Sequence, residues 1–140
     1  LLEGMSDHGV LTSIDPDAER QAAARKVLSL ARIRSNQVRL ITGTPLDVLP
    51  KLRDGAYDMV LINGDRLEYV EYVSQALRLL RTGGIAVVND ALANNHVADP
   101  DNEDDDTLII RETLDSVLET EEFTPVLLPV GEGLLLATKS

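Results

Sequence analysis

The chain has 140 residues, enough for one domain of ordinary size. It carries 13 Lys and Arg against 24 Asp and Glu, and its formal net charge of -11 argues against a surface that binds nucleic acid or anionic lipid, because phosphates attract basic side chains. No Cys is present, which excludes disulfides and thiolate chemistry. No apolar run approaches the ~20 residues that span a bilayer, and no signal peptide is visible, so we expect a cytoplasmic protein.

Short apolar runs alternate with longer amphipathic ones along most of the chain. Strands are predicted at residues 10–14, 38–42, 57–62 and 85–89, and the third of them is expected to be buried. Helices are predicted at residues 17–32, 45–52, 67–80 and 107–120, with Gly83 and Gly84 ending the third. One face of the first predicted helix carries the apolar residues Ala23, Val27, Leu30 and Ala31.

The end of the chain departs from this alternation. Two apolar runs, residues 123–128 and 134–138, are separated by five residues only, which is too short for a parallel crossover and predicts an antiparallel hairpin. The whole pattern predicts an α/β fold in a single domain, 1–140, with a parallel sheet covered by helices on both faces.

Polar residues or Gly follow each predicted strand of the parallel sheet. They are Asp15, then Gly43 and Thr44, then Asn63, Gly64 and Asp65, then Asn89 and Asp90. Ligands of open α/β sheets bind beyond the carboxyl ends of the strands, so the series favours a ligand cleft there. Ordinary turn chemistry is the alternative, since Asn, Asp and Gly dominate turns.

Asp15 is the most informative of these residues. An acid at the tip of a strand that precedes a helix can accept both hydroxyls of a ribose, as in enzymes that bind dinucleotides or nucleoside sulfonium compounds. Asp15 could instead cap the helix that follows, although Asp17 could fill that role.

Residues 99–106, DPDNEDDD, hold six acids and no base. Such a run repels itself and is most simply a solvated loop. A calcium site is the alternative, but the run lacks the central Gly and the twelfth-position Glu of an EF-hand.

The chain resembles the catechol-type (family 3) O-methyltransferases, and in particular their actinobacterial branch. The stretches that carry the resemblance are LTSIDPDAE, VRLITGTPLDVLPKL, YDMVLINGDRLEY, LRLLRTGGIAVVND and FTPVLLPVGEGLLLATK. The resemblance implies a class I methyltransferase fold, a Rossmann-like sheet that is mostly parallel and closes with an antiparallel hairpin. The family's first strand and Gly-rich loop are missing from these residues, so we expect an N-terminally truncated domain.

The resemblance also implies a cofactor, S-adenosyl-L-methionine, and its binding residues. Asp15 takes the place of the acid that binds the ribose, and Asn63 and Gly64 lie where the cofactor meets the family's metal site. The expected border of the adenine is formed by Gly43, Thr44, Pro45 and Leu46.

The residues of the family's metal site are changed. The family pattern Asp-x-x-Lys is replaced by Asn63 to Arg66, and the family's Asp-Asn pair by Asp90 and Ala91. Asp90 is then the one carboxylate ligand left, and a divalent metal is doubtful because Mg²⁺ prefers anionic oxygens. Arg66 occupies the catalytic position but keeps its proton, so it cannot be a base; it could pair with an anionic substrate or with Asp65, or be solvated.

The sequence thus predicts a methyltransferase that transfers a methyl group from S-adenosylmethionine to a hydroxyl of a small molecule. The alternative is a non-catalytic relative that acts as a binding or interaction protein, which the changed metal ligands favour. A nicotinamide-binding domain is a third interpretation, against which the terminal hairpin and the lack of a G-x-G-x-x-G motif count. A homodimer of the intact protein is left open.

Overall fold

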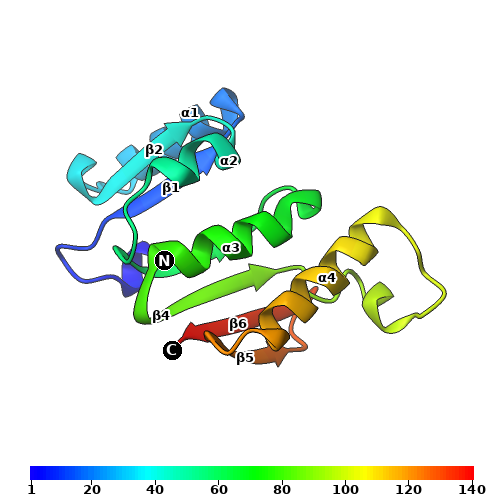
Figure 1. Cartoon of the computed structure of the whole chain (residues 1–140). Coiled ribbons are helices and arrows are strands. Elements are labelled where there is room, and N and C mark those ends of the chain that lie inside the picture. Colours follow the sequence, from blue (N-terminus) through cyan, green and yellow to red (C-terminus); the bar gives the residue numbers. More distant parts are fainter. The chain divides into compact units, whose positions relative to one another are not determined.

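The computed structural model describes all residues from Leu1 to Ser140 (Figure 1). They divide into two compact units, Leu1–Lys51 and Leu52–Ser140. The prediction of a single domain stays a prediction. None of the helices has the length and apolarity that a membrane crossing needs.

The first unit is a small parallel βαβ arrangement. Strand β1 (Leu11–Asp15) pairs in parallel with β2 (Val38–Thr42), so that Asp15 lies opposite Thr42. Helix α1 (Ala18–Leu30) connects the two strands, and the short helix α2 (Pro45–Val48) follows β2 and continues as a 3-10 turn to Lys51. The predicted strands and helices of this unit are confirmed, with shifts of a few residues at their ends.

The apolar face predicted for α1 points to solvent. All four of its residues, Ala23, Val27, Leu30 and Ala31, are exposed. The helix instead turns Gln21 inward, which is only 3% exposed. The side-chain amide of Gln21 donates to the carbonyl oxygens of Ser13 at 3.2 Å and Ile41 at 3.0 Å. A polar contact therefore sets the rotation of the helix, which apolar periodicity does not reveal.

The second unit contains a four-stranded sheet with the order β3-β4-β6-β5. Its strands are β3 (Tyr57–Ile62), β4 (Leu80–Asn89), β5 (Phe123–Leu128) and β6 (Leu134–Lys139). β3 and β4 are parallel, whereas β6 is antiparallel to both β4 and β5. The predicted terminal hairpin is confirmed.

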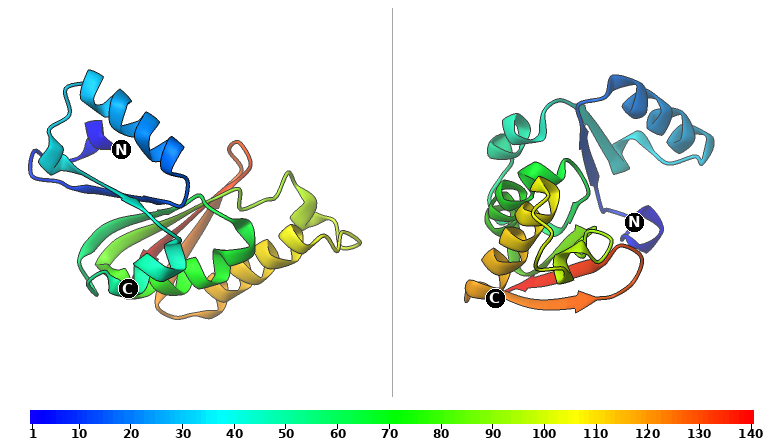
Figure 2. Two further views of the ribbon diagram at one scale, coloured as in Figure 1. Left: turned by 90° about the horizontal axis from the view of Figure 1, so that it is seen from above. Right: turned by 90° about the vertical axis from the view of Figure 1, so that its right-hand side faces the viewer.

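Helices α3 (Tyr69–Leu79) and α4 (Asp105–Glu119) lie side by side on one face of this sheet (Figure 2). The core between them combines Ile62, Ala86, Val88, Leu135 and Ala137 from the strands with Tyr69, Val73, Ala76, Leu79, Ile110 and Val117 from the helices. Met59 and Leu61 point away from this core and are 39% and 47% exposed. The prediction of a buried third strand is therefore wrong, because alternate side chains of β3 lack a covering layer.

The predicted end of α3 is also wrong. The helix ends at Leu79, and Gly83 and Gly84 belong to β4, which begins at Leu80. The ammonium group of Lys139 donates to the carbonyl oxygens of Leu77 and Leu80, each at 2.8 Å. A cation is favourable at the carbonyl end of a helix, so β6 stabilises the point at which α3 stops.

We expect Gln21→Met to lower the free energy of unfolding by about 1–3 kcal/mol, because two carbonyl groups lose their buried donor. Urea denaturation followed by circular dichroism measures this effect. Arg25→Met, on the exposed side of the same helix, is the matched control and should change stability by under about 0.5 kcal/mol. Equal stabilities of the two variants would contradict this role of Gln21.

Candidate functional site

Asp15 and Gly43 mark the carboxyl ends of the two parallel strands of the first unit. The backbone N–H of Gly43 donates to the carbonyl oxygen of Asp15 at 3.1 Å, so the two ends are adjacent. The Asp15 side chain is 29% exposed. Its Oδ1 accepts the N–H of Asp17 at 2.8 Å, and its Oδ2 lies 3.6 Å from Nε of Arg20.

Asp17, and not Asp15, caps helix α1. The Oδ1 atom of Asp17 accepts the backbone N–H groups of Glu19 at 2.9 Å and Arg20 at 3.1 Å. The bond from the Arg20 N–H is the main cause that lowers the pKa of Asp17. Asp15 therefore does not cap helix α1, which was the alternative role for it. Its carboxylate lies at the end of β1, where the hydrogen bond from the Asp17 N–H orients it.

The segment from Gly43 to Leu46 forms the turn into α2. Pro45 occupies the first helical position, and the Thr44 side chain is exposed and makes no capping bond. A Cβ on Gly43 would lie 3.1 Å from Cγ2 of Val48. Such a distance is tighter than an ordinary contact, so Gly lets the turn pack closely against α2.

In the second unit, the ends of β3 and β4 meet through two asparagines. The amide of Asn89 donates to Oδ1 of Asn63 at 3.0 Å. After Asn63, the Asp65 side chain accepts the N–H of Leu67 at 3.0 Å and begins the 3-10 helix Arg66–Glu68. Asn63 and Gly64 lie at the strand end as predicted, whereas Asp65 is a helix cap.

Arg66 forms an ion pair with Asp90. Its Nη2 donates to Oδ2 of Asp90 at 3.2 Å, and its Nη1 lies 3.6 Å from Oδ2 of Asp106. The side chains of Arg66 and Asp90 are 30% and 19% exposed, so the pair is partly shielded from water. The sequence suggested Asp65 as an internal partner, and the structure shows Asp90 and Asp106 instead.

The direction of Asp90 depends on the terminal hairpin. Asp90 has a left-handed backbone, with φ of 57°. The next two N–H groups, of Ala91 and Leu92, donate to the carbonyls of Gly133 at 3.1 Å and Glu132 at 3.0 Å, in the loop between β5 and β6. A Cβ on Gly133 would come within 2.6 Å of the Leu92 side chain, so this close approach requires Gly.

The donor set around Asp90 does not fit a divalent metal ion. The oxygen of Asn63 accepts from Asn89, the side chain of Ala91 offers no oxygen, and Asp90 is paired with Arg66. No group of three or more His, Asp or Glu side chains is placed to share a metal ion.

Tyr69 lies beside this ion pair, although it is not among the residues predicted for the site. Its ring is fully buried, and its hydroxyl has no hydrogen-bond partner. Burial raises the pKa of this hydroxyl to about 12; the negative charge of Asp90 adds to the shift and the positive charge of Arg66 opposes it. The spacing of three between Arg66 and Tyr69, close to one helical turn, is the signal that could have linked them.

The acidic run is folded around one arginine. Arg111 of α4 donates to the carbonyls of Val97 at 3.2 Å, Asn102 at 2.7 Å and His96 at 3.1 Å, and also to that of Asp99. The acidic side chains of the run are exposed, but only residues 99–104 form the predicted loop, because Asp105 and Asp106 belong to the first turn of α4. A cavity of about 360 Å³ beside it is lined by Arg66, Ala93, Asn94, His96, Asp104, Asp105, Asp106 and Thr107.

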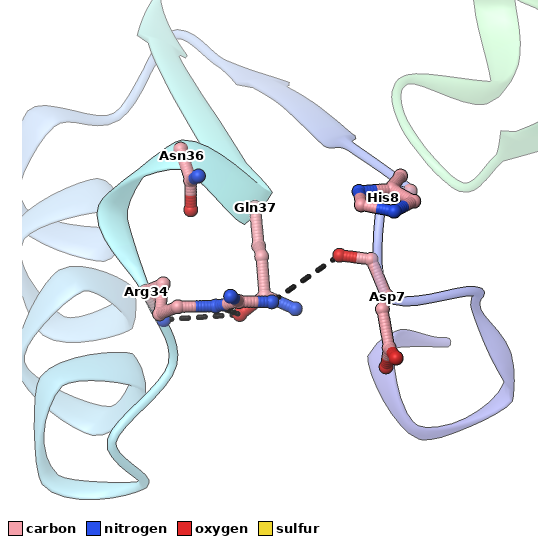
Figure 3. A pocket seen from close by; sticks show the side chains of 6 residues that line it. Asp7, His8, Arg34, Asn36 and Gln37 are labelled. Carbon is pink, nitrogen blue, oxygen red and sulfur yellow. Dashed lines mark hydrogen bonds between the residues drawn. The ribbon is translucent and has the colours of Figure 1, made fainter.

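A second hollow, of about 280 Å³, lies before the amino ends of β1 and β2 (Figure 3). Arg34 crosses it, donating to Oε1 of Gln37 at 3.4 Å and to the carbonyl oxygen of Asp7 at 3.2 Å. His8, Gly9 and Asn36 complete its lining. It lies at the opposite ends of these strands from Asp15.

Comparisons with known proteins identify the family. Residues 2–140 match the model of the family described as O-methyltransferase. The chain belongs to this family. A Mycobacterium tuberculosis protein named "Probable O-methyltransferase" is 40% identical over 139 residues, which cover 99% of this chain and 62% of that protein. The chain therefore spans about three fifths of the length of this relative. The resemblance predicted from the sequence is confirmed.

Solved structures confirm the predicted class I methyltransferase fold. A Corynebacterium glutamicum protein matches with a TM-score of 0.95 and 33% identity, over 99% of this chain and 64% of that one. The O-methyltransferase TomG of Streptomyces achromogenes, solved in complex with S-adenosylmethionine, matches with a TM-score of 0.90 and 25% identity, over 99% and 66%.

The buried Tyr69 hydroxyl predicts a pH-dependent stability. Its pKa lies near 12 in the folded state, above the ordinary value of 10.0. The folded state keeps a proton that the unfolded state releases, so stability is complete below about pH 10 and falls as the pH rises toward 12. Tyr69→Phe should weaken this fall in urea denaturation between pH 9 and 11.5.

At pH 7 the free energy of unfolding of Tyr69→Phe should equal that of the wild type or exceed it by up to about 1 kcal/mol, because the substitution removes an unsatisfied buried hydroxyl. Tyr57→Phe, at the start of β3, is the control. A large loss of stability in Tyr69→Phe would show that the hydroxyl has a partner in the fold.

Proposed function

We propose that the protein transfers the methyl group of S-adenosylmethionine to a hydroxyl of a small molecule. The observation that carries the proposal is the Asp15 carboxylate, which stands at the carboxyl end of β1 while Asp17 caps α1. Family membership and the cofactor complex of TomG support the choice of cofactor. The cytoplasmic location and the homodimer considered from the sequence stay predictions.

In this proposal Asp15 accepts the two ribose hydroxyls of the cofactor. The bond from the Asp17 N–H orients the carboxylate before the ligand arrives, which lowers the entropy cost of binding. The turn from Gly43 to Leu46 borders the adenine, and its tight packing against Val48 keeps the backbone in place. Asn63 and Gly64, at the end of β3, are further residues that we propose for cofactor binding.

The reaction is a displacement at carbon. The bound cofactor supplies an electrophilic methyl group on a sulfonium centre. The acceptor oxygen forms the new O–C bond while the S–C bond breaks and its electron pair stays on sulfur. The protein contributes chiefly by holding the two reactants in line, and Arg66 is proposed to orient the acceptor, since it cannot take its proton.

Cofactor binding and its dependence on Asp15 test the proposal. Asp15→Asn should weaken S-adenosylmethionine binding by about 2 kcal/mol, or about thirtyfold, because an ionised acceptor of two hydroxyl bonds becomes neutral. Isothermal titration calorimetry measures the affinity.

Asp17→Asn is the matched control, because Asn also caps helices well, and its cofactor affinity should stay near that of the wild type. If Asp15→Asn bound the cofactor as tightly as the control, the proposed ribose contact would be wrong. Cofactor binding without methyl transfer to any hydroxyl compound would favour the non-catalytic alternative.

A further inference from the structure

Arg66 lies between two carboxylates at the edge of a cavity. Its guanidinium reaches Oδ2 of Asp90 at 3.2 Å on one side and Oδ2 of Asp106 at 3.6 Å on the other. Among the residues that line the cavity, Arg66 is the one Lys or Arg. Its positive charge therefore compensates the negative charges of both Asp90 and Asp106.

Each contact of Arg66 is fixed by neighbouring structure. Asp90 is directed by its left-handed turn, whose following residues bond to the hairpin loop. Asp106 belongs to the first turn of α4, and Asp65 anchors the start of the 3-10 helix that carries Arg66. A guanidinium keeps its proton at any working pH, so this charge is permanent.

We propose that the Arg66 guanidinium is the resident cation of this site, which neutralises Asp90 and Asp106 in place of a divalent ion and leaves no metal bound at Asp90. If the proposed methyl transfer holds, the acceptor hydroxyl lies against Arg66 and the reaction needs no metal.

The neighbouring residues support this assignment. A divalent ion at Asp90 would lie within a few ångströms of the guanidinium and be repelled by it. It would also have to break the contact between Asn63 and Asn89 to gain an amide oxygen, and Ala91 could supply no side-chain ligand. Hard cations need several oxygen ligands, so one already paired carboxylate holds them poorly.

Tyr69 lies beside the pair but is closed off from the cavity. Its hydroxyl is buried, has no partner, and feels the charges of both Asp90 and Arg66. Because its side chain is fully buried and does not line the cavity, Arg66 is the donor that faces an acceptor there.

This arrangement limits which hydroxyl compounds can accept the methyl group. A permanent guanidinium cannot take a proton at neutral pH. The proton of the acceptor hydroxyl therefore passes to solvent or to one of the carboxylates beside Arg66, the oxygen lone pair forms the bond to the methyl carbon, and the electrons of the broken S–C bond remain on sulfur. Such a route favours hydroxyl groups acidic enough to ionise without a metal.

The test measures metal binding directly and needs neither cofactor nor acceptor, so its result is independent of the proposed methyl transfer. Thermal unfolding is followed with and without millimolar Mg²⁺, and NMR line broadening by Mn²⁺ is recorded at the Asp90 amide. The wild type should show no Mg²⁺ stabilisation and no broadening selective for Asp90. Selective broadening of the Asp90 amide signal in the wild type would overturn the proposal. If the Arg66→Gln variant does not fold, this measurement on the wild type decides the proposal by itself.

Arg66→Gln removes the cation and leaves two carboxylates unneutralised. The variant should gain Mn²⁺ affinity at Asp90 by at least about tenfold and become stabilised by Mg²⁺, because a unit positive charge a few ångströms away no longer opposes the ion. Arg81→Gln, which breaks an exposed Arg–Asp pair with Asp58 in the same unit, is the matched control and should behave as the wild type. An Arg66→Gln variant no more responsive to metal than Arg81→Gln would contradict the role of Arg66 as resident cation.

Discussion

The antiparallel pairing of β6 with β4 is the constraint on which the ion pair of Arg66 with Asp90 depends. Because β6 runs beside β4 to its end, the loop before β6 reaches the residues that follow Asn89. Two backbone bonds from this loop hold Ala91 and Leu92, and the lack of a side chain at Gly133 permits the approach. Asp90 thereby adopts the left-handed turn from which its carboxylate meets Arg66.

Electrostatics in this acidic chain are organised by a few arginines. Arg66 joins the ends of β4 and α4, and Arg111 gathers the carbonyls of the loop between them. The same stretch that predicts a self-repelling run is thus held at its backbone, and one of its carboxylates, that of Asp106, is paired with Arg66 while the other acidic side chains are exposed. Residues of this loop, among them Ala93, Asn94 and His96, line the cavity beside Arg66.

Most of the secondary structure could be predicted from local patterns. Residues 38–42, 57–62 and 123–128 form strands with the predicted bounds, because apolar runs flanked by turn residues mark them clearly. The hairpin followed from the length of its link alone. The inward face of α1 could not be predicted, because a polar Gln21 fixes its rotation through two backbone carbonyls.

The site residues were predictable one by one, but their contacts were not. Asp15 and Asp90 could be located because strands end before them. The pair of Arg66 with Asp90 joins residues that are 24 positions apart and depends on a left-handed backbone at a non-glycine residue. The buried state of the Tyr69 hydroxyl depends on the packing of α3 against the sheet, which local sequence does not report.

A crystal structure of the protein with S-adenosylhomocysteine, grown in millimolar Mn²⁺, tests the central claim most directly. We expect both ribose hydroxyls on the Asp15 carboxylate, Arg66 still paired with Asp90, and no anomalous manganese peak beside them. A ribose held by other residues, or a manganese ion on Asp90 with Arg66 displaced, would contradict the account.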